Sequence, residues 1–422
     1  MLVKIHGIGN LKIQMGMVNS MENAKIIYSN EKEFLDRKFK IEKNFFVNFS
    51  ERIDDFFSSS GRIELLGNHT DHNNGKVLVS AVSLDIFAGV KKTNDNYIRI
   101  VSEGFPLMTI NINNLSLSPN EKGKSSAMVK GVVQGFLNRG LKVGGFICYA
   151  TSNIYKGAGV SSSAAYELLI CEILNYYYNE DKVDRVEMAK IAQYSEVEFF
   201  GKPCGLLDQM GISLGGVNMI DFKSTKTPLI QHVELELKDY DVVLINTGDD
   251  HSALTPYYAE IKDDMAKIAK HFKKNVLREV THEDFLNEIP TLRKKFGGRA
   301  IIRAMHYYDE NNRVEKAYKA ICNKDISTFL NCVNESGESS YKMLQNCYYA
   351  NDASQGITLA LTISKKIIKD GACRVHGGGF AGTILAFVNK NESDYYLDVM
   401  KKVFGDENCN RVNLRMLGSI KI

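Results

Sequence analysis

The sequence predicts a protein of the α+β class that is organised in two or three domains. Its 422 residues exceed the length of an ordinary single domain. Apolar strand-like runs are separated by helical patterns, and glycine and asparagine mark most of the turns. The expected strands include residues 77–82, 97–102, 145–150, 217–222, 241–246 and 383–388, and the expected helices include 166–174 and 258–272.

The composition is that of an ordinary globular protein, with 44% hydrophobic and 24% charged residues. The 53 basic and 50 acidic residues leave a net charge of +3, so we expect no nucleic-acid partner. No run approaches the roughly 20 apolar residues of a membrane helix, so we expect no membrane partner either. Eight dispersed cysteines without a CxxC pair are typical of reduced thiols, which indicates a cytoplasmic protein.

A polar turn at residues 61–75 (GRIELLGNHTDHNNG) is the most informative segment. It holds a cation, an amide, two imidazoles and a carboxylate between glycines, directly before the expected strand at 77–82. Polar groups that cluster where the backbone turns beside a core are typical of a site for a small polar ligand. The alternative interpretation is a polar surface turn.

A loop of small residues at 157–165 (GAGVSSSAA) joins the expected strand at 145–150 to the expected helix at 166–174. This arrangement directs free backbone amides and the positive end of the helix at an anion. Glycines let phosphate oxygens approach the main chain, and serines add hydroxyl donors or a metal ligand. A tight turn is the alternative, but three consecutive serines at a helix start favour phosphate binding.

A third glycine-rich segment lies at 374–382 (RVHGGGFAG), directly before the expected strand at 383–388. Four glycines around one aromatic residue indicate that the backbone comes very close to another group. A bulge between two strands would explain the same pattern, so this segment is informative mainly together with the other two.

Together and in this order, the three segments resemble the motifs of the GHMP kinase superfamily, and within it those of the galactokinase branch. Residues 196–210 (EVEFFGKPCGLLDQM) are similar to a further motif of that branch. Shorter pieces at 128–134, 303–306 and 334–336 are similar as well. The resemblance therefore extends from about residue 45 to near the C-terminus.

The resemblance implies two lobes with the active site in the cleft between them. Residues 1–235 would form an N-terminal lobe similar to domain 2 of ribosomal protein S5, with 1–44 as a lead-in of uncertain structure. Residues 236–422 would form a ferredoxin-like C-terminal lobe. The implied activity is that of an ATP-dependent sugar kinase, which phosphorylates the anomeric hydroxyl of galactose and uses Mg²⁺.

The resemblance assigns the phosphates of ATP to seven residues of the second segment: Gly157, Ala158, Gly159, Val160, Ser161, Ser162 and Ser163. Ser163 and Glu196 would hold Mg²⁺, a hard cation that prefers oxygen ligands. Asp208 would accept or orient the proton of the attacking hydroxyl, and Arg62 beside it would keep it ionised. Whether Asp208 is a true base or an orienting anion stays open.

The sugar is assigned in the same way to residues from three segments: Asn68, His69, Thr70, Asp71, Gly205 and Tyr258. The residues around Tyr258 match the branch poorly, so Tyr257 is an alternative for the tyrosine that closes over the sugar.

Several residues depart from the pattern of the branch. Asn68 replaces a glutamate that faces the substituent at sugar C6, and His72 replaces a tyrosine. A neutral amide suits either a hydroxymethyl or a carboxylate group, and plant galacturonokinases look similar at this turn. Ala381 interrupts the last glycines by one methyl group, and Gly337 replaces a histidine, which nothing in the sequence explains.

We therefore expect galactose as the substrate, with galacturonate or another C6- or C2-modified hexose, such as N-acetylgalactosamine, as the alternative. A sugar sensor on a kinase fold is an alternative of another class, but a sensor has no need of Arg62, Asp208, Ser163 and Glu196 together. A mevalonate- or homoserine-type kinase would take an acyclic substrate, which the polar turn at 68–71 disfavours. The oligomeric state stays open.

Overall fold

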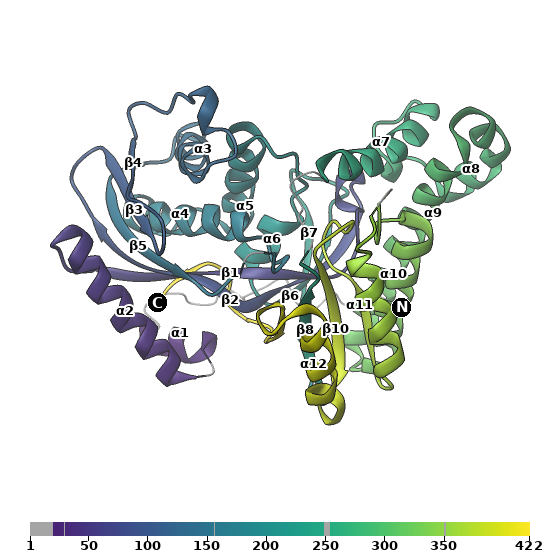
Figure 1. The fold of residues 1–422 in the computed structure, drawn as a ribbon. Coiled ribbons are helices and arrows are strands. Elements are labelled where there is room, and N and C mark those ends of the chain that lie inside the picture. The colour runs from purple at the N-terminus through teal and green to yellow at the C-terminus, as the bar shows by residue number, and fades with distance from the viewer. Residues whose placement is uncertain (1–19, 29, 156, 249–253, 350–351) are drawn as a thin grey trace, which may run out of the picture.

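The computed structural model describes residues 20–28, 30–155, 157–248, 254–349 and 352–422. Helices surround two separate sheets, one of eight strands and one of four (Figure 1). The α+β class predicted from the sequence is therefore confirmed.

The larger sheet has the strand order β12-β1-β2-β5-β3-β4, with β6 beside β2 and β7 beside β6. Its pairs are antiparallel except for β3 with β5. Its strands are β1 (Asp55–Leu66), β2 (Lys76–Lys92), β3 (Tyr97–Ser102), β4 (Met108–Asn111), β5 (Phe146–Ser152), β6 (Val217–Asp221), β7 (Leu229–Val233) and β12 (Ile420–Lys421). Because β12 comes from the end of the chain, a division at residue 235 separates this strand from the sheet that it completes.

Helices cover both faces of the larger sheet, with α3 to α6 on one face and α1 and α2 on the other (Figure 1). Side chains alternate along β2 as they do in any strand: Ile86 and Ala88 join the core under α3 and α4, whereas Phe87 packs on Phe34 and Phe45 of α2. These helices are α1 (Ser20–Ile27), α2 (Glu31–Phe49), α3 (Ser125–Leu137), α4 (Ser162–Asn179), α5 (Arg185–Tyr194) and α6 (Leu207–Leu214).

The smaller sheet has the strand order β11-β8-β10-β9 and is antiparallel throughout. Leu244 and Leu385 on one face pack against α9, α10 and β1, so this face joins the two sheets. Ile245 and Ile384 on the other face pack against α11 and α12. The strands are β8 (Tyr240–Asn246), β9 (Gly371–Val375), β10 (Thr383–Asn389) and β11 (Cys409–Val412).

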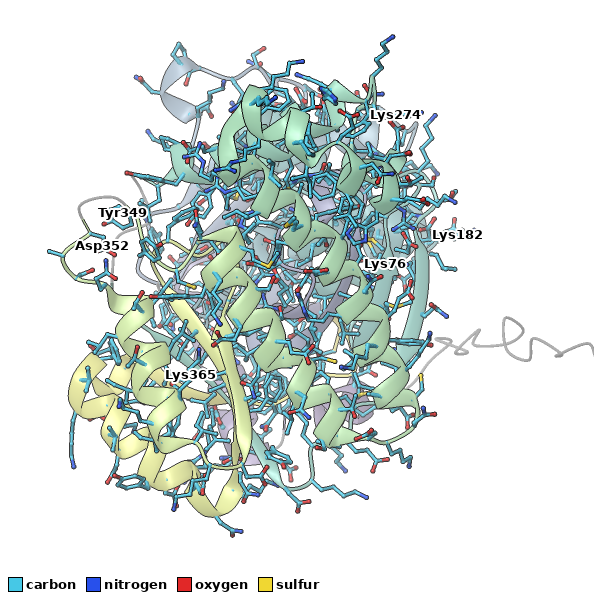
Figure 2. All side chains as sticks on the ribbon, turned by 90° about the vertical axis from the view of Figure 1, so that its right-hand side faces the viewer. Lys76, Lys182, Lys274, Tyr349, Asp352 and Lys365 are labelled. Carbon is cyan, nitrogen blue, oxygen red and sulfur yellow. The ribbon has the colours of Figure 1, made fainter. Side chains whose placement is uncertain are left out.

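The remaining helices cover the second half of the molecule. They are α7 (Thr255–His271), α8 (His282–Asn287), α9 (Ile289–Cys322), α10 (Ile326–Ser339), α11 (Gly356–Ile367) and α12 (Lys390–Phe404). Lys76, at the start of β2, forms ion pairs with Glu315 of α9 and Asp221 of β6 on the side of the molecule that Figure 2 shows. Within the described ranges, no helix has both the length and the apolar character needed to cross a membrane. All eight cysteines are free thiols.

The predicted strands and helices agree well with the structure. The runs at 77–82, 97–102, 145–150, 217–222, 241–246 and 383–388 correspond to β2, β3, β5, β6, β8 and β10, although β5 begins one residue later and β6 ends one residue earlier than predicted. The helical patterns at 166–174 and 258–272 fall in α4 and α7, although α7 ends one residue earlier. Residues 31–44, which the sequence analysis left in a lead-in of uncertain structure, all belong to α2, and residues 1–19 lie outside the described part of the chain.

Candidate active site

The small-residue loop between β5 and α4 presents the start of a long helix without a side-chain cap. Gly157, Gly159 and Ser161 all have positive φ angles, of 81°, 72° and 62°. Ser161 occupies the N-cap position of α4, yet its side chain does not bond to the backbone amides of the helix. Uncapped amides and the positive end of the helix dipole favour an anion at this position.

This loop is held in place from both sheets. Thr383 of β10 donates a hydrogen bond from Oγ1 to the carbonyl of Gly157 at 2.8 Å. On the opposite side, the Arg62 amide of β1 donates to the carbonyl of Val160 at 3.0 Å. A Cβ atom at Gly61 would lie 2.7 Å from Cγ2 of Val160, so glycine is required for this close approach. The loop therefore has a fixed shape at the junction of the two sheets.

Arg62 and Asp208 come together directly beside the loop. Nη2 of Arg62 lies 2.7 Å from Oδ1 of Asp208, and its Nε donates to the same oxygen at 2.9 Å. Nη1 of Arg62 donates to the carbonyl of Gly159 at 2.6 Å, and the Ser161 hydroxyl donates to the other oxygen of Asp208. One guanidinium thus connects the acid at the start of α6 to the small-residue loop.

The environment of Asp208 keeps this acid ionised. Burial alone would raise the pKa of Asp208, but the charge of Arg62, the hydrogen bond from Ser161 and the charge of Lys202 together lower it below the ordinary value of 3.8. At neutral pH the carboxylate therefore accepts hydrogen bonds and is a weak base. Orientation of an attacking hydroxyl fits these properties better than complete removal of its proton.

Ser163 and Glu196 form a second polar pair on the same loop. The Ser163 hydroxyl donates to Oε1 of Glu196 at 2.9 Å, and Nζ of Lys202 lies 3.3 Å from the same oxygen. Gln209 donates from Nε2 to the other oxygen of Glu196 at 2.7 Å. Among the described residues, no group of three or more His, Cys, Asp or Glu side chains could hold a metal ion alone. A hydroxyl and one carboxylate suit Mg²⁺ that takes its other oxygens from phosphates and water.

Asp71 lies against the segment that carries Asp208. A Cβ atom at Gly205 would lie 1.7 Å from Oδ2 of Asp71, so only glycine permits this contact. Burial and the nearby charge of Asp208 raise the pKa of Asp71 from 3.8 to about 6. The sequence assigned Asp71 and Gly205 to the sugar separately, and the structure brings the two into contact beside Asp208.

His69 and Tyr258 both contact the third glycine-rich segment. Nε2 of His69 lies 3.0 Å from the carbonyl oxygen of Gly378, and burial lowers the pKa of His69 to about 4, which leaves the ring neutral.

The Tyr258 hydroxyl donates to the carbonyl of Gly379 at 3.1 Å. A Cβ atom at Gly378 would lie 2.4 Å from Cε1 of Tyr258. Tyr257 instead packs its ring on Tyr349 and Phe380, so the contact with the glycines comes from Tyr258.

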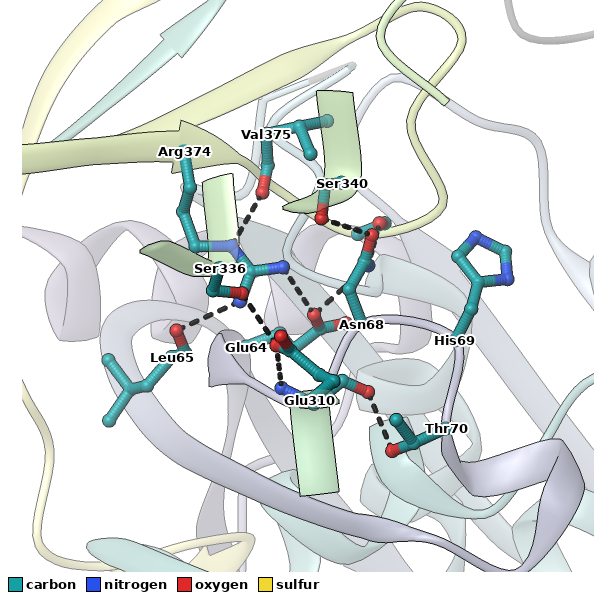
Figure 3. Close-up of polar contacts among 12 residues, drawn as sticks. Glu64, Leu65, Asn68, His69, Thr70, Glu310, Ser336, Ser340, Arg374 and Val375 are labelled. Atoms are coloured by element: carbon teal, nitrogen blue, oxygen red, sulfur yellow. Dashed lines mark hydrogen bonds and ion pairs between the residues drawn. The ribbon is translucent and has the colours of Figure 1, made fainter. Parts of the chain in front are cut away.

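The side chain of Asn68 is surrounded by protein partners and is only 1% exposed. Its Nδ2 donates to Oε1 of Glu64 at 3.0 Å (Figure 3) and to the carbonyl of Gly377 at 2.7 Å. Its Oδ1 accepts from Asn346 at 2.8 Å and from Ser340 at 3.3 Å. A glutamate here would set a carboxylate against Glu64 and a carbonyl, so the network explains the amide without reference to a sugar substituent.

Thr70 stabilises the turn itself. Its Oγ1 donates a shared hydrogen bond to the carbonyls of Gly67 and Lys76, at 2.9 and 2.7 Å, and the side chain is fully buried. Its hydroxyl therefore forms hydrogen bonds within the turn. Its neighbours in the chain are the residues with predicted sugar contacts.

A buried ion pair beneath the turn was not assigned from the sequence. Nη2 of Arg374 on β9 binds Oε1 of Glu64 on β1 at 2.9 Å, and its Nη1 donates to the carbonyl of Leu65 at 2.9 Å (Figure 3). The only local signal was a glutamate between apolar neighbours in a strand. Gly337 belongs to the same contact, because a Cβ atom there would lie 2.9 Å from the carbonyl oxygen of Cys373 and 3.1 Å from Cβ of Arg374. Glycine at 337 thus lets α10 approach β9.

The chain is similar to known proteins over most of its length. The sequence profile of the GHMP kinases N terminal domain matches residues 127–216, and that of the galactokinase galactose-binding signature matches residues 43–92. The galactokinase of Clostridium tetani is 31% identical over 373 residues, which cover 87% of this chain and 92% of the relative. The galactokinase of Thermotoga maritima is 31% identical over 332 residues, which cover 78% and 88%.

Solved structures show the same architecture. The galactokinase of Lactococcus lactis, in complex with galactose, superposes with a TM-score of 0.80 at 24% identity and covers 91% of this chain and 99% of its own. The mevalonate kinase of Methanococcus jannaschii superposes with a TM-score of 0.61 at 16% identity and covers 85% and 98%. The fold is therefore the two-lobed fold of the GHMP kinases.

Proposed function

Because this chain belongs to the galactokinase family of GHMP kinases, we propose that it transfers the γ-phosphoryl group of ATP to the anomeric hydroxyl of galactose. The observation that carries this proposal is the contact of Arg62 with both Asp208 and the Gly159 carbonyl, which joins an ionised acid to an anion-binding helix start. The two parts that phosphoryl transfer requires, an acceptor-orienting group and a phosphate cradle, are thus adjacent.

Asp208 orients the acceptor hydroxyl, and Arg62 stabilises negative charge on the transferred group. The structure supports these roles because Asp208 is already ionised and fixed by two partners, so little reorganisation is needed when the substrates bind. The amides at the start of α4 bind the phosphates of ATP.

Ser163 and Glu196 are the residues that would hold Mg²⁺. Their hydroxyl and carboxylate oxygens lie 2.9 Å apart and belong to the donor types that this ion prefers. When bound, the ion would neutralise charge on the phosphates. The ammonium of Lys202, at 3.3 Å from the same Glu196 oxygen, indicates that the position favours a cation.

Asp71, His69, the Gly205 backbone and Tyr258 bind the sugar hydroxyls. Their positions beside Asp208 and the third glycine-rich segment support this assignment. The internal network of Asn68 removes the main reason to prefer galacturonate, because its amide already has partners on both of its atoms. We also place the enzyme in the cytoplasm, which its eight free cysteines support, since thiols persist in reducing compartments.

A substrate panel tests the proposed function. The purified protein is given ATP and Mg²⁺ with galactose, galacturonate, N-acetylgalactosamine or mevalonate, and ADP release is measured. We expect the highest kcat/KM with galactose. Turnover of galacturonate without turnover of galactose would change the assigned substrate, and the absence of sugar-dependent ADP release would contradict the kinase and favour a sensor.

A further inference from the structure

His376, the first residue after β9, has a buried imidazole without a hydrogen-bond partner. The residue is 3% exposed, and neither Nδ1 nor Nε2 has a partner among the described residues. A buried polar group that stays unpaired destabilises a folded protein. The adjacent Asn68 and Arg374 side chains have hydrogen-bond partners on all their polar atoms, whereas both ring nitrogens of His376 lack one.

The direction of the His376 side chain follows from the alternation along β9. Cys373 and Val375 face the core under α11 and α12, whereas Arg374 points to the opposite side and reaches Glu64 of β1 (Figure 3). The amide of His376 donates to the carbonyl of Thr383 at 2.9 Å, which continues the pairing of β9 with β10. His376 therefore lies on the same side as Arg374, two residues further along, toward β1 and Arg62.

The neighbours of His376 place it between the two binding segments. The carbonyl of the next residue, Gly377, accepts the hydrogen bond from Asn68 in the polar turn. The residue that its own amide contacts, Thr383, donates to the Gly157 carbonyl in the phosphate loop. The backbone at His376 thus lies between the turn that we propose to hold the sugar and the loop that we propose to hold the phosphates.

The charges around His376 keep its ring neutral. Burial is the largest cause that lowers its pKa well below 6.5, and the positive charges of Arg62 and Arg374 lower it further, against the charge of Asp208. A neutral imidazole has one N–H donor and one acceptor nitrogen. Phosphoryl oxygens can satisfy only the donor, whereas a sugar hydroxyl can satisfy either nitrogen.

We propose that His376 is a further substrate-binding residue, whose imidazole hydrogen-bonds to substrate oxygen at the junction of the sugar and the transferred phosphoryl group. The inference rests on the proposed function and extends it to a residue that the sequence motifs left without a role. The unpaired nitrogens are the binding groups, and their unfavourable burial is offset when the substrates arrive.

The test uses variants that separate stability from binding. His376→Leu removes both nitrogens at similar volume, and His376→Asn keeps one donor and one acceptor. Thr151→Val is the matched control, because the Thr151 hydroxyl is also buried and unpaired but lies on β5 of the larger sheet, whereas His376 follows β9 of the smaller sheet. Urea unfolding is measured for each protein, together with calorimetric binding of galactose and, separately, of the ATP analogue adenylyl imidodiphosphate.

We expect His376→Leu to unfold at the same or a higher urea concentration than the wild type, and to bind galactose at least about 10-fold more weakly. His376→Asn should recover part of the affinity, and Thr151→Val should gain stability without any change in binding. A loss of affinity confined to the ATP analogue would also support the contact, with phosphoryl oxygen as its source.

Two results would overturn the inference. If His376→Leu and His376→Asn both bind galactose and the ATP analogue and phosphorylate galactose as the wild type does, the ring only fills space. If His376→Leu is less stable than the wild type while Thr151→Val is not, the ring has a structural partner. A wild-type protein that phosphorylates no sugar would instead contradict the proposed function itself, so the two failures are distinguishable.

Discussion

The guanidinium of Arg62 lies 2.7 Å from the carboxylate of Asp208 and donates at the same time to the carbonyl of Gly159. The two side chains are 146 positions apart in the sequence and come from β1 and from the start of α6. A planar guanidinium can make both contacts because its donors point in fixed and different directions. The same residue therefore positions Asp208 and the loop at 157–163, to which we assign acceptor orientation and phosphate binding.

Replacement of Arg62 by lysine tests this double contact. A lysine keeps the charge but cannot hold Asp208 and the Gly159 carbonyl together, so we expect kcat to fall by about 100-fold or more and KM for the sugar to change much less. Steady-state kinetics measure both values. Arg185→Lys is the control, because Arg185 also binds an acid and a carbonyl, those of Glu172 and Ser419, away from the site. Equal kinetic effects of the two substitutions would contradict the role of Arg62.

Replacement of Ser163 by alanine tests the proposed metal site. The hydroxyl lies 2.9 Å from Glu196, and its removal takes away one of the two protein oxygens. We expect the Mg²⁺ concentration that gives the half-maximal rate to rise by about 10-fold or more. Ser152→Ala, at the exposed end of β5, should leave this concentration unchanged. An unchanged Mg²⁺ requirement in Ser163→Ala would exclude Ser163 as a ligand.

The pH dependence should reveal Asp71. Its pKa of about 6 lies above the ordinary value of 3.8, so the folded state holds this proton more strongly and loses stability as the pH rises from about 4 to 6. Asp71→Asn should therefore be more stable than the wild type at pH 7, by up to about 3 kcal/mol. The measurement is urea unfolding of both proteins between pH 4 and 8. A stability difference that does not change with pH would contradict the raised pKa.

Asp71 should also control sugar binding through the same proton. In the proposed sugar site, the ionised carboxylate above pH 6 accepts hydrogen bonds from sugar hydroxyls. Below pH 6 the protonated carboxyl group accepts fewer hydrogen bonds. We expect KM for the sugar to rise as the pH falls through 6 in the wild type and to vary less in Asp71→Asn. Asp208 does not titrate in this range, because Arg62 and Ser161 hold its pKa below 3.8.

The Asn68 network predicts a coupling between positions 68 and 64. Asn68→Glu restores the residue usual in the branch, but its carboxylate would face Oε1 of Glu64, which now accepts from the amide at 3.0 Å. We expect a loss of about 2–4 kcal/mol in the free energy of unfolding. The double variant Asn68→Glu/Glu64→Gln should recover about 1 kcal/mol or more relative to the sum of the single variants. Additive effects would show that the two side chains do not interact.

The sequence was sufficient to locate the three glycine-rich segments, because the backbone conformation of each depends on residues that are close together in the chain. Glycines with positive φ at 157 and 159, and the uncapped start of α4, are properties of short stretches of chain. The strand β1 was not predicted: residues 61–66, which the sequence analysis placed in the polar turn, are the end of this strand and pair with β2.

Contacts between distant segments could not be predicted in this way. Arg374 and Glu64 are separated by 310 positions, and only the packing of the smaller sheet on β1 brings them together. The role of Gly337 depends on the same approach of α10 to β9. The structure also shows that both polar atoms of the Asn68 amide form hydrogen bonds with other residues of the protein. A comparison of motifs does not reveal these bonds.

The most direct measurement follows the phosphorylated sugar by ³¹P NMR in the wild type and in Asp208→Asn, with galactose, ATP and Mg²⁺. The account predicts that the wild type forms a phosphate ester at the anomeric carbon. Asp208→Asn should form the same product at least about 100-fold more slowly while it still binds galactose. Phosphorylation at another hydroxyl, or an equal rate in the two proteins, would contradict the account.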